Sequence, residues 1–352
     1  MVRWQIVMVA MVLLGWINGR ISAQDAHFSQ FYANPLYLSP SLAGATDGGR
    51  IILNYRNQWP AITKAYSTYS ASFDNFFPTF NSGIGVYVMR DRAGSAGLTT
   101  TNAAFQYSYN LQINKQWQVI PGIQFEYGNK AIDLWKVKLG YDLSFSGGSS
   151  SWERLNLDQV HYFDLATSAF LYNPKYWVGF SLHHLTQPNY SFMGQEMKIP
   201  LKATLFGGMN IWTERNRRAL TTRSFSWSFR YQHQQQFKQL DAGMYWHNTP
   251  FELGLWYRGL PLLGEVETVL NHDAIVALVA WEYGPFRVGY SYDITISKLG
   301  WNTAGAHELS LIYEFNQRFS LRAGSHPPLP CSKTANPLDS KKPQQQRKRT
   351  MF

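Results

Sequence analysis

The stretch "FRVGYSYDI", residues 286–294, decides the fold class. Every second residue is apolar (Phe, Val, Tyr, Tyr, Ile), and the positions between them carry Arg, Gly, Ser and Asp. Apolar residues at every second position lie on one face of a β-strand. The same alternation recurs in "NAAFQYSYNL", residues 102–111, and in "HELSLIYEF", residues 307–315. The sequence therefore predicts strands with one apolar face and one polar face.

Fourteen such strands can be placed along the chain, most of them about as long as a tilted strand that crosses a membrane. An even number of strands is typical of a single-chain outer-membrane barrel and leaves both termini on one side. The predicted strands cover residues 50–59, 66–75, 82–90, 99–111, 117–127, 162–172, 176–185, 201–212, 223–232, 239–248, 251–259, 273–283, 285–295 and 305–315.

The composition favours a membrane barrel over a soluble β-sandwich or jelly roll, which would also alternate. Aromatic residues make up 16% of the chain and charged residues only 15%, against about 25% charged in soluble domains. The polar faces carry mainly Ser, Thr, Asn, Gln and Gly, whereas a soluble outer face would carry more charge. Tryptophans near the ends of predicted strands suit a membrane–water interface; they are Trp59, Trp117, Trp177, Trp212, Trp246, Trp256 and Trp281. We therefore expect an all-β, antiparallel transmembrane barrel of about 14 strands.

Four regions follow from this pattern. Residues 1–23 read as a secretory signal peptide, with Arg3 before an apolar run over 6–17 that is too short to span a membrane. Residues 24–49 form an N-terminal segment, and residues 50–325 form the barrel. Residues 326–352 form a basic tail with five Pro, whose six Lys and Arg against one Asp give a net charge of +5. Its composition predicts disorder, on the periplasmic side of the barrel.

Few residues offer catalytic or metal chemistry. His183 and His184 are adjacent, so on a strand they would point to opposite faces, one to the lumen and one to an interface. Glu265 and Glu267 fall in an expected loop, and no G-x-S-x-G motif is present. Cys331 is the only cysteine and is read as a free thiol. We expect no enzymatic activity, no metal and no cofactor, and an exported chain is a poor candidate for binding nucleic acid.

The stretch "QDAHFSQFYANPLYLSPSLAG", residues 24–44, is unusually apolar for the start of a mature chain. Pro35 and Pro40 interrupt it, so it reads as neither a long helix nor a long strand. We expect this segment to plug the barrel or cap its periplasmic mouth. Its aromatic residues would then pack inside; they are Phe28, Phe31, Tyr32 and Tyr37.

This stretch and the following "RIILNYRNQWP", residues 50–60, closely resemble the start of the PorP/SprF family, outer-membrane components of the type IX secretion and gliding system of Bacteroidota. The segments "WVGFSLHHLTQPN" at 177–189, "LDAGMYW" at 240–246 and "VGYSYDITIS" at 288–297 also look like family sequences. The resemblance covers about residues 24–325, and the extra basic tail departs from it.

The resemblance implies a non-enzymatic role in Gram-negative cells, in the outer membrane and in contact with its lipid. It implies partners among other type IX components, including the periplasmic lipoprotein ring, and the C-terminal signal domain of a secreted cargo such as a large surface adhesin. Candidate partner or plug residues are Phe28, Phe31, Tyr32, Tyr37, Asn54, Arg56 and Trp59, and candidate tether residues in the tail are Lys341, Lys342, Arg347, Lys348 and Arg349. The alternative function is a diffusion porin or a channel for hydrophobic compounds, for which fourteen strands leave room.

Overall fold

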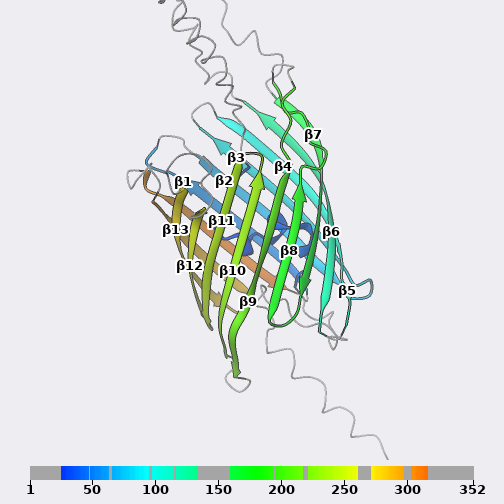
Figure 1. Cartoon of the computed structure of the whole chain (residues 1–352), viewed down its shortest axis with the longest axis vertical. Helices are drawn as coiled ribbons and strands as arrows, with labels where there is room; N and C mark the ends of the chain where they lie inside the picture. The colour runs from blue at the N-terminus through cyan, green and yellow to red at the C-terminus, as the bar shows by residue number, and fades with distance from the viewer. Residues whose placement is uncertain are drawn as a thin grey trace, which may run out of the picture.

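The structure is a computed structural model that describes residues 25–46, 48–62, 66–94, 97–114, 116–132, 159–192, 196–216, 221–260, 271–296 and 303–315. It is almost entirely antiparallel β-sheet (Figure 1). The described strands are β1 (Gly49–Gln58), β2 (Tyr66–Phe77), β3 (Ser82–Ala93), β4 (Leu98–Tyr109), β5 (Leu111–Gln112), β6 (Gln118–Ala131), β7 (Gln159–Tyr172), β8 (Tyr176–His183), β9 (Lys202–Asn216), β10 (Thr221–Gln234), β11 (Phe237–Asn248), β12 (Phe251–Leu260), β13 (Asn271–Tyr283), β14 (Phe286–Thr295) and β15 (Ala306–Phe315).

Apart from β4 and β5, each strand pairs with its neighbour in sequence, and β1 pairs with β15, which joins the two ends of the sheet. The strand predicted over 99–111 is interrupted at Asn110, whose amide donates to the Asn81 carbonyl instead. Its two parts, β4 and β5, both pair with β6. The sheet is therefore a closed antiparallel barrel of fourteen strands, which confirms the predicted fold class.

The alternation seen in the sequence separates the two faces of the wall. Along β1, Ile51, Leu53 and Tyr55 are exposed, whereas Asn54 and Arg56 are buried toward the lumen. The same alternation holds in β4 and β14. An apolar outer face around a polar lumen is the pattern of a membrane barrel.

Two tryptophans contradict the interface interpretation. Trp212, Trp246 and Trp281 are exposed on the outer face. Trp177 and Trp256, however, are only 4% and 3% exposed and belong to a buried cluster inside the barrel. A position near the end of a predicted strand does not decide which face a side chain occupies, and the strand register places both of these tryptophans on the inner face.

The N-terminal segment, residues 25–46, folds into three short helices: η1 (Phe31–Ala33), α2 (Pro35–Leu38) and η2 (Pro40–Leu42). Pro35 and Pro40 each occupy the first helical position, where a missing backbone N–H costs nothing. Each proline thus starts one turn and ends the element before it. No helix in the described parts of the chain is long and apolar enough to cross a membrane.

The two rims of the barrel differ in their connections. Short turns at residues 78–81, 173–175, 249–250 and 284–285 share one rim with the end of β15. We call it the short-turn rim, and the opposite rim, which carries the connections 132–158 and 184–201, the long-loop rim.

The ends of the described chain lie at opposite rims. Asp25, the first described residue, binds Lys202, which begins β9 at the long-loop rim, whereas Phe315 ends β15 at the short-turn rim. The sequence-based prediction put both termini at one end, because it counted strands and took no account of a segment that runs along the lumen.

Candidate functional site in the barrel lumen

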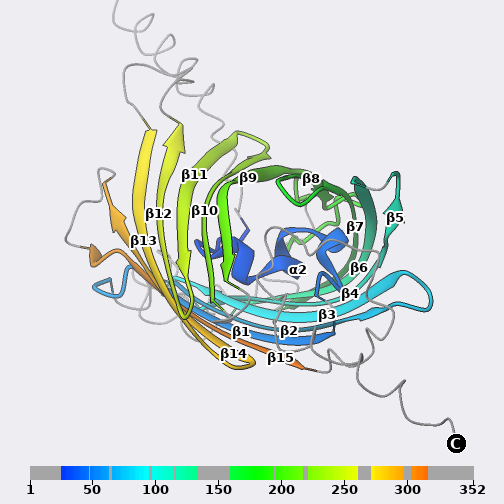
Figure 2. The same cartoon turned by 90° about the horizontal axis from the view of Figure 1, so that it is seen from below.

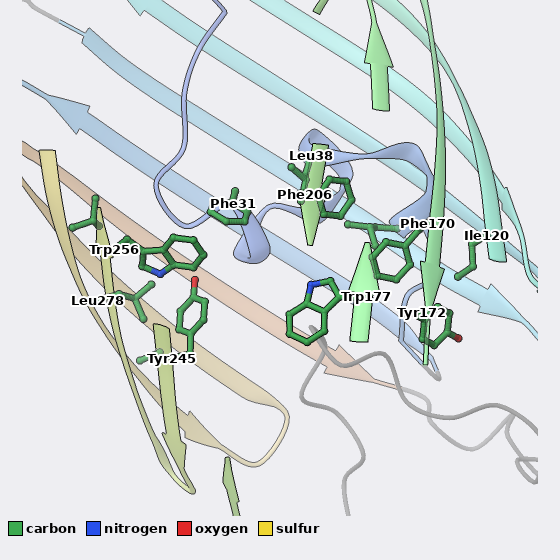
Figure 3. Close-up of a cluster of buried hydrophobic side chains, with 13 residues drawn as sticks. Phe31, Leu38, Ile120, Phe170, Tyr172, Trp177, Phe206, Tyr245, Trp256 and Leu278 are labelled. Atoms are coloured by element: carbon green, nitrogen blue, oxygen red, sulfur yellow. The ribbon is translucent and has the colours of Figure 1, made fainter. Parts of the chain in front are cut away.

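The N-terminal segment lies inside the ring of strands (Figure 2). Phe31 packs edge-on against Trp256 of β12, with ring centroids 4.9 Å apart. On the other side, Trp177 of β8 donates a hydrogen bond to the Tyr32 hydroxyl at 3.0 Å. Figure 3 shows Phe31 and Leu38 of the segment among aromatic side chains from the wall. This cluster fixes the middle of the segment across the lumen.

A second apolar cluster holds the opposite flank of the segment. Phe28 and Leu36 are buried with Tyr87 and Met89 of β3. Tyr37 lies edge-on to Phe28 at 5.4 Å, and its hydroxyl donates to the Ala26 carbonyl at 2.5 Å. The four aromatic residues singled out in the sequence therefore divide between two clusters, with Phe28 and Tyr37 in one and Phe31 and Tyr32 in the other.

A charged network links strands that are far apart in the sequence. We call it the arginine cluster; it consists of Arg56 (β1), Arg230 (β10), Asp241 (β11), Arg258 (β12), Asp293 (β14) and Glu308 (β15). Arg258 bridges Asp241 and Asp293, with Nε and Nη1 3.1 and 3.0 Å from their oxygens. Arg56 bridges Asp293 and Glu308 at 2.8 and 3.1 Å. Three cations balance three carboxylates, and all six are buried.

Ser29 sits at the centre of this cluster. Its hydroxyl donates to Asp293 at 2.7 Å and accepts from Arg56 at 2.7 Å and from Arg258 at 2.6 Å. Its backbone amide and that of Gln30 donate to the two oxygens of Glu308, at 2.8 and 3.0 Å. Ser29 therefore uses one donor and two acceptor positions of its hydroxyl, all that a serine offers.

Arg230 holds the residues just before Ser29. Its guanidinium donates to the Phe28 carbonyl at 3.2 Å and lies 2.9 Å from Nε2 of His27. Burial, followed by the charges of Arg258 and Arg230, holds the pKa of His27 well below its ordinary value. His27 is therefore neutral at pH 7, and it can accept the hydrogen bond from Arg230.

The other residues that the sequence singled out lie outside the arginine cluster. Asn54 donates to the Ala33 carbonyl at 3.3 Å, so it contacts the N-terminal segment as Arg56 does. Trp59 lies at the long-loop rim, edge-on to Tyr66, and its amide donates to Gly305. The tether candidates Lys341, Lys342, Arg347, Lys348 and Arg349 lie outside the described residues, as do Cys331, Glu265 and Glu267.

At the long-loop rim, the start of the segment is held by charges. Asp25 lies 2.9 Å from both Lys202 Nζ and His184 Nε2, and the other ring nitrogen of His184 lies 2.6 Å from Asp164. Burial alone would raise the pKa of Asp25, but Lys202 and His184 lower it well below its ordinary value. Burial would likewise lower the pKa of His184, but Asp25 and Asp164 raise it to about 10. Asp25 and His184 are thus a charged pair at pH 7.

The expected placement of the two histidines is wrong. His183 and His184 are 6% and 7% exposed, and both lie on the inner side of the wall. β8 ends at His183, and His184 has a φ of +61°, outside extended geometry. The left-handed backbone turns its ring inward toward Asp25, so the alternation rule fails one residue past the strand.

Backbone contacts show how closely the segment approaches the wall. A Cβ at Gly122 of β6 would lie 2.3 Å from the Ser41 amide, and one at Gly83 of β3 would lie 2.1 Å from the Ala43 carbonyl. Real Cβ atoms do not come this close to backbone, so both positions require glycine while the segment is docked.

One group in the described part of the chain has the composition of a metal site. Ligand atoms of His247, Glu252 and Glu282 lie within 4.8 Å of one another. Arg287 already lies 3.3 Å from Glu252 and 3.9 Å from Glu282. A guanidinium in that position balances the carboxylates, so the arrangement fits an ionic network better than a metal.

Sequence reasoning named Arg56 but missed the five other members of the arginine cluster. Each is a charged residue on the inward, mostly uncharged face of its strand. A charged residue at such a position could have indicated an ionic network in the sequence, because a lone charge in a crowded lumen needs a partner of opposite charge. The pairing itself joins β1, β10 and β12, which no local pattern relates.

Solved structures with a related arrangement are distant. The toluene transporter TodX of P. putida aligns with a TM-score of 0.46 and 11% identity, over 79% of this chain and 93% of that one. The KdgM porin aligns with a TM-score of 0.37 and 8% identity, over 76% and 99%. A mutant of the Rh. blastica porin aligns with a TM-score of 0.34 and 6% identity, also over 76% and 99%.

Among curated proteins no sequence matches. A family model described as type IX secretion system membrane protein PorP/SprF matches residues 21–313, which includes the N-terminal segment and the described barrel almost to the end of β15. The match confirms the resemblance noted in the sequence, and the chain belongs to the PorP/SprF family of type IX secretion system membrane proteins.

Proposed function

We propose that this barrel is a docking component of the type IX machinery in the outer membrane, without enzymatic activity. In this role it binds the C-terminal signal domain of a secreted cargo, such as a large adhesin, and holds that cargo at the cell surface. It also couples to the periplasmic lipoprotein ring.

The observation that carries the proposal is the N-terminal segment inside the lumen of a family member. Two apolar clusters and the arginine cluster hold the segment, and together they contain inward side chains from strands on different parts of the barrel. A filled lumen suits a protein that presents surfaces to partners at its two rims. It does not suit a protein whose task is free diffusion.

The alternative, a diffusion porin or a channel for hydrophobic compounds, needs a continuous open path. Such a path would require release of Phe31 from Trp256 and of Ser29 from the arginine cluster. These contacts favour docking over diffusion.

The rims suggest an orientation. Outer-membrane barrels have short periplasmic turns and longer extracellular loops. We therefore place the short-turn rim, and with it the root of the basic tail, in the periplasm. Asp25 then lies toward the extracellular side, and the tail is the part best placed to reach the lipoprotein ring.

Deletion of the gene tests the docking role. We expect loss of secretion or surface display of at least one type IX cargo, measured by mass spectrometry of surface-shaved cells. The strain complemented with the intact gene is the control. If every type IX cargo still reaches the surface in the deletion strain, the barrel does not dock cargo.

A further inference from the structure

We propose that a polar patch on the outer face of the barrel, near the long-loop rim, binds the phosphate groups of lipid A in the extracellular leaflet. We call it the phosphate patch; it consists of Arg90 and Arg92 of β3 and two hydroxyl side chains beside them, Ser67 of β2 and Thr101 of β4. The inference goes beyond the docking function, and it rests on the orientation proposed above only for the leaflet that the patch meets.

The two arginines of the patch point outward. Arg90 and Arg92 are exposed, and they continue the outward face of β3 after Val88, which is 52% exposed. Asp91, between them in sequence, lies on the other face of the strand, where it accepts a hydrogen bond from Thr68 at 2.6 Å. Residues two apart on a strand are separated by about 7 Å, so both guanidinium groups belong to one small area of the outer wall.

These two arginines differ from the other arginines whose side chains the structure describes. The exposed Arg223 donates to the Asn248 side chain at 3.1 Å. The arginines of the lumen all pair with carboxylates; they are Arg50, Arg56, Arg230, Arg258 and Arg287. Arg90 and Arg92 form no hydrogen bond or ion pair with any residue that the structure describes. Two neighbouring cations repel each other, and charge on a lipid-facing wall is unfavourable, so an anion bound between them would stabilise both.

Hydroxyl groups flank the two arginines on both neighbouring strands. β3 lies between β2 and β4 in the wall (Figure 1). In the register of the sheet, Arg92 is directly opposite Ser67, and Arg90 is directly opposite Thr101. Side chains in such positions share a face, with Cβ atoms about 5 Å apart. Guanidinium groups bind phosphate oxygens through paired N–H donors, and hydroxyl groups can donate to the same oxygens. The patch therefore offers the donors that a phosphate group accepts.

The same face becomes apolar toward the short-turn rim. Val86 is exposed and lies opposite Phe73 of β2 and Phe105 of β4, which are also exposed. Tyr69, opposite Arg90, is 54% exposed and marks the boundary, where a tyrosine suits a membrane–water interface. A lipid whose phosphates bind the arginines would thus lay its acyl chains along these apolar side chains. This continuity selects a phosphorylated lipid over free phosphate.

The position of the patch along the wall selects the leaflet. β3 starts after the turn 78–81 at the short-turn rim and ends at Ala93, so Arg92 lies next to the long-loop rim. Longer loops are extracellular in outer-membrane barrels. The anionic lipid of the extracellular leaflet is lipopolysaccharide, whose lipid A part carries phosphates on its sugars. Clustered arginines beside a membrane attract such anionic head groups.

Binding of defined lipids to the purified full-length barrel in detergent tests the proposal, with native mass spectrometry as the measurement. We expect bisphosphorylated lipid A to bind at least tenfold more tightly than lipid A without its phosphates, and at least fivefold more tightly than phosphatidylglycerol. Equal binding with and without the phosphates would overturn the proposal. Phosphatidylglycerol that binds as tightly as lipid A would also overturn it, because the site would then not select the lipid of the extracellular leaflet. These outcomes do not depend on cargo display, so the docking function stands or fails separately.

Substitutions in the patch test which residues bind the phosphates. The double variant Arg90→Gln and Arg92→Gln should bind bisphosphorylated lipid A at least tenfold less tightly. Its matched control, Lys198→Gln with Lys238→Gln, removes two exposed cations of the same rim and should change the affinity less than twofold. Equal losses in the two double variants would show that lipid A responds only to the net charge of the rim, which would refute the patch. If the arginine variant fails to fold, the comparison of lipids on the natural chain still decides.

Discussion

At the scale of single residues, Ser29 is the point where the N-terminal segment and the charged lumen meet. Arg56 and Arg258 both donate to its hydroxyl, which in turn donates to Asp293. Replacing that hydroxyl with hydrogen leaves two guanidinium donors in a buried site with one acceptor fewer. A buried donor that loses its partner costs about 1–3 kcal/mol, more when it is charged.

We therefore predict that Ser29→Ala weakens docking of the segment by about 2 kcal/mol. Amide hydrogen exchange over residues 25–34 should rise at least tenfold, while exchange in β1 and β15 stays unchanged. Ser72→Ala is the matched control, because the buried Ser72 hydroxyl has no hydrogen-bond partner among the described residues. Equal effects from the two substitutions would show that the hydroxyl of Ser29 does not hold the segment.

The Asp25–His184 contact predicts a dependence on alkaline pH. The pKa of His184 is raised to about 10 when the segment is docked, against about 6.5 for a free histidine. Its contribution to docking is therefore complete below about pH 6.5 and is lost as pH rises to about 10. Protection factors at residues 25–28 should fall between pH 7 and pH 10. In Asp25→Asn the fall should be much smaller, and identical protection at both pH values in the natural chain would contradict the assignment.

The contacts of individual residues were the part of the structure that the sequence predicted least well. The apolar character of Phe28 and Phe31 marked them as buried, because an exposed aromatic segment at a chain start is unfavourable. Which wall residues receive them depends on barrel closure. The partners of Ser29 come from positions 56, 258, 293 and 308, and only the closed sheet brings these positions together.

At the scale of elements, the strands could be predicted almost completely. An apolar face toward lipid and a polar face toward the lumen impose a period of two on every strand, and that period is visible in a single sequence. The structure departs from this alternation at two positions. At Asn110, a hydrogen bond to Asn81 splits one predicted strand into two. At His184, a left-handed φ turns the ring toward the lumen. The short helices of the N-terminal segment are too short to show a hydrophobic periodicity in the sequence, and only Pro35 and Pro40 indicated where α2 and η2 begin.

The N-terminal segment as an element predicts a change in conductance. Replacing Phe28, Phe31, Tyr32 and Tyr37 together with Ser removes the apolar contacts on both flanks of the segment. The segment should loosen, and the current through purified barrels in planar bilayers should rise from near zero to steady openings. Replacement of the same four residues with Leu, which keeps apolar contact, should raise it much less. A current unchanged by the serine variant would mean that the four aromatic residues do not close the lumen.

At the scale of the whole molecule, the fold separates two tasks. The outer face is compatible with a lipid bilayer, because nearly all backbone groups form hydrogen bonds within a closed sheet and most of the outward side chains are apolar. The lumen carries the polar and charged groups that hold the segment. Neither task requires the basic tail, whose residues 326–352 follow Phe315, the last residue of β15, in the sequence.

The tail should therefore be separable from the barrel. We predict that replacing Lys341, Lys342, Arg347, Lys348 and Arg349 with Gln leaves assembly unchanged, as judged by heat-modifiable migration on gels, because the charges lie beyond the last strand. Co-purification of periplasmic partners from native membranes should fall severalfold. In the natural chain the same co-purification should weaken as salt rises from 50 to 500 mM, because the screening length for charges falls from about 14 Å to about 4 Å in that range. The matched control replaces Gln344, Gln345 and Gln346 with Ser, which alters the tail without altering its charge and should retain the partners. Partners that stay bound to the charge-neutralised tail would show that the barrel holds them through its rims alone.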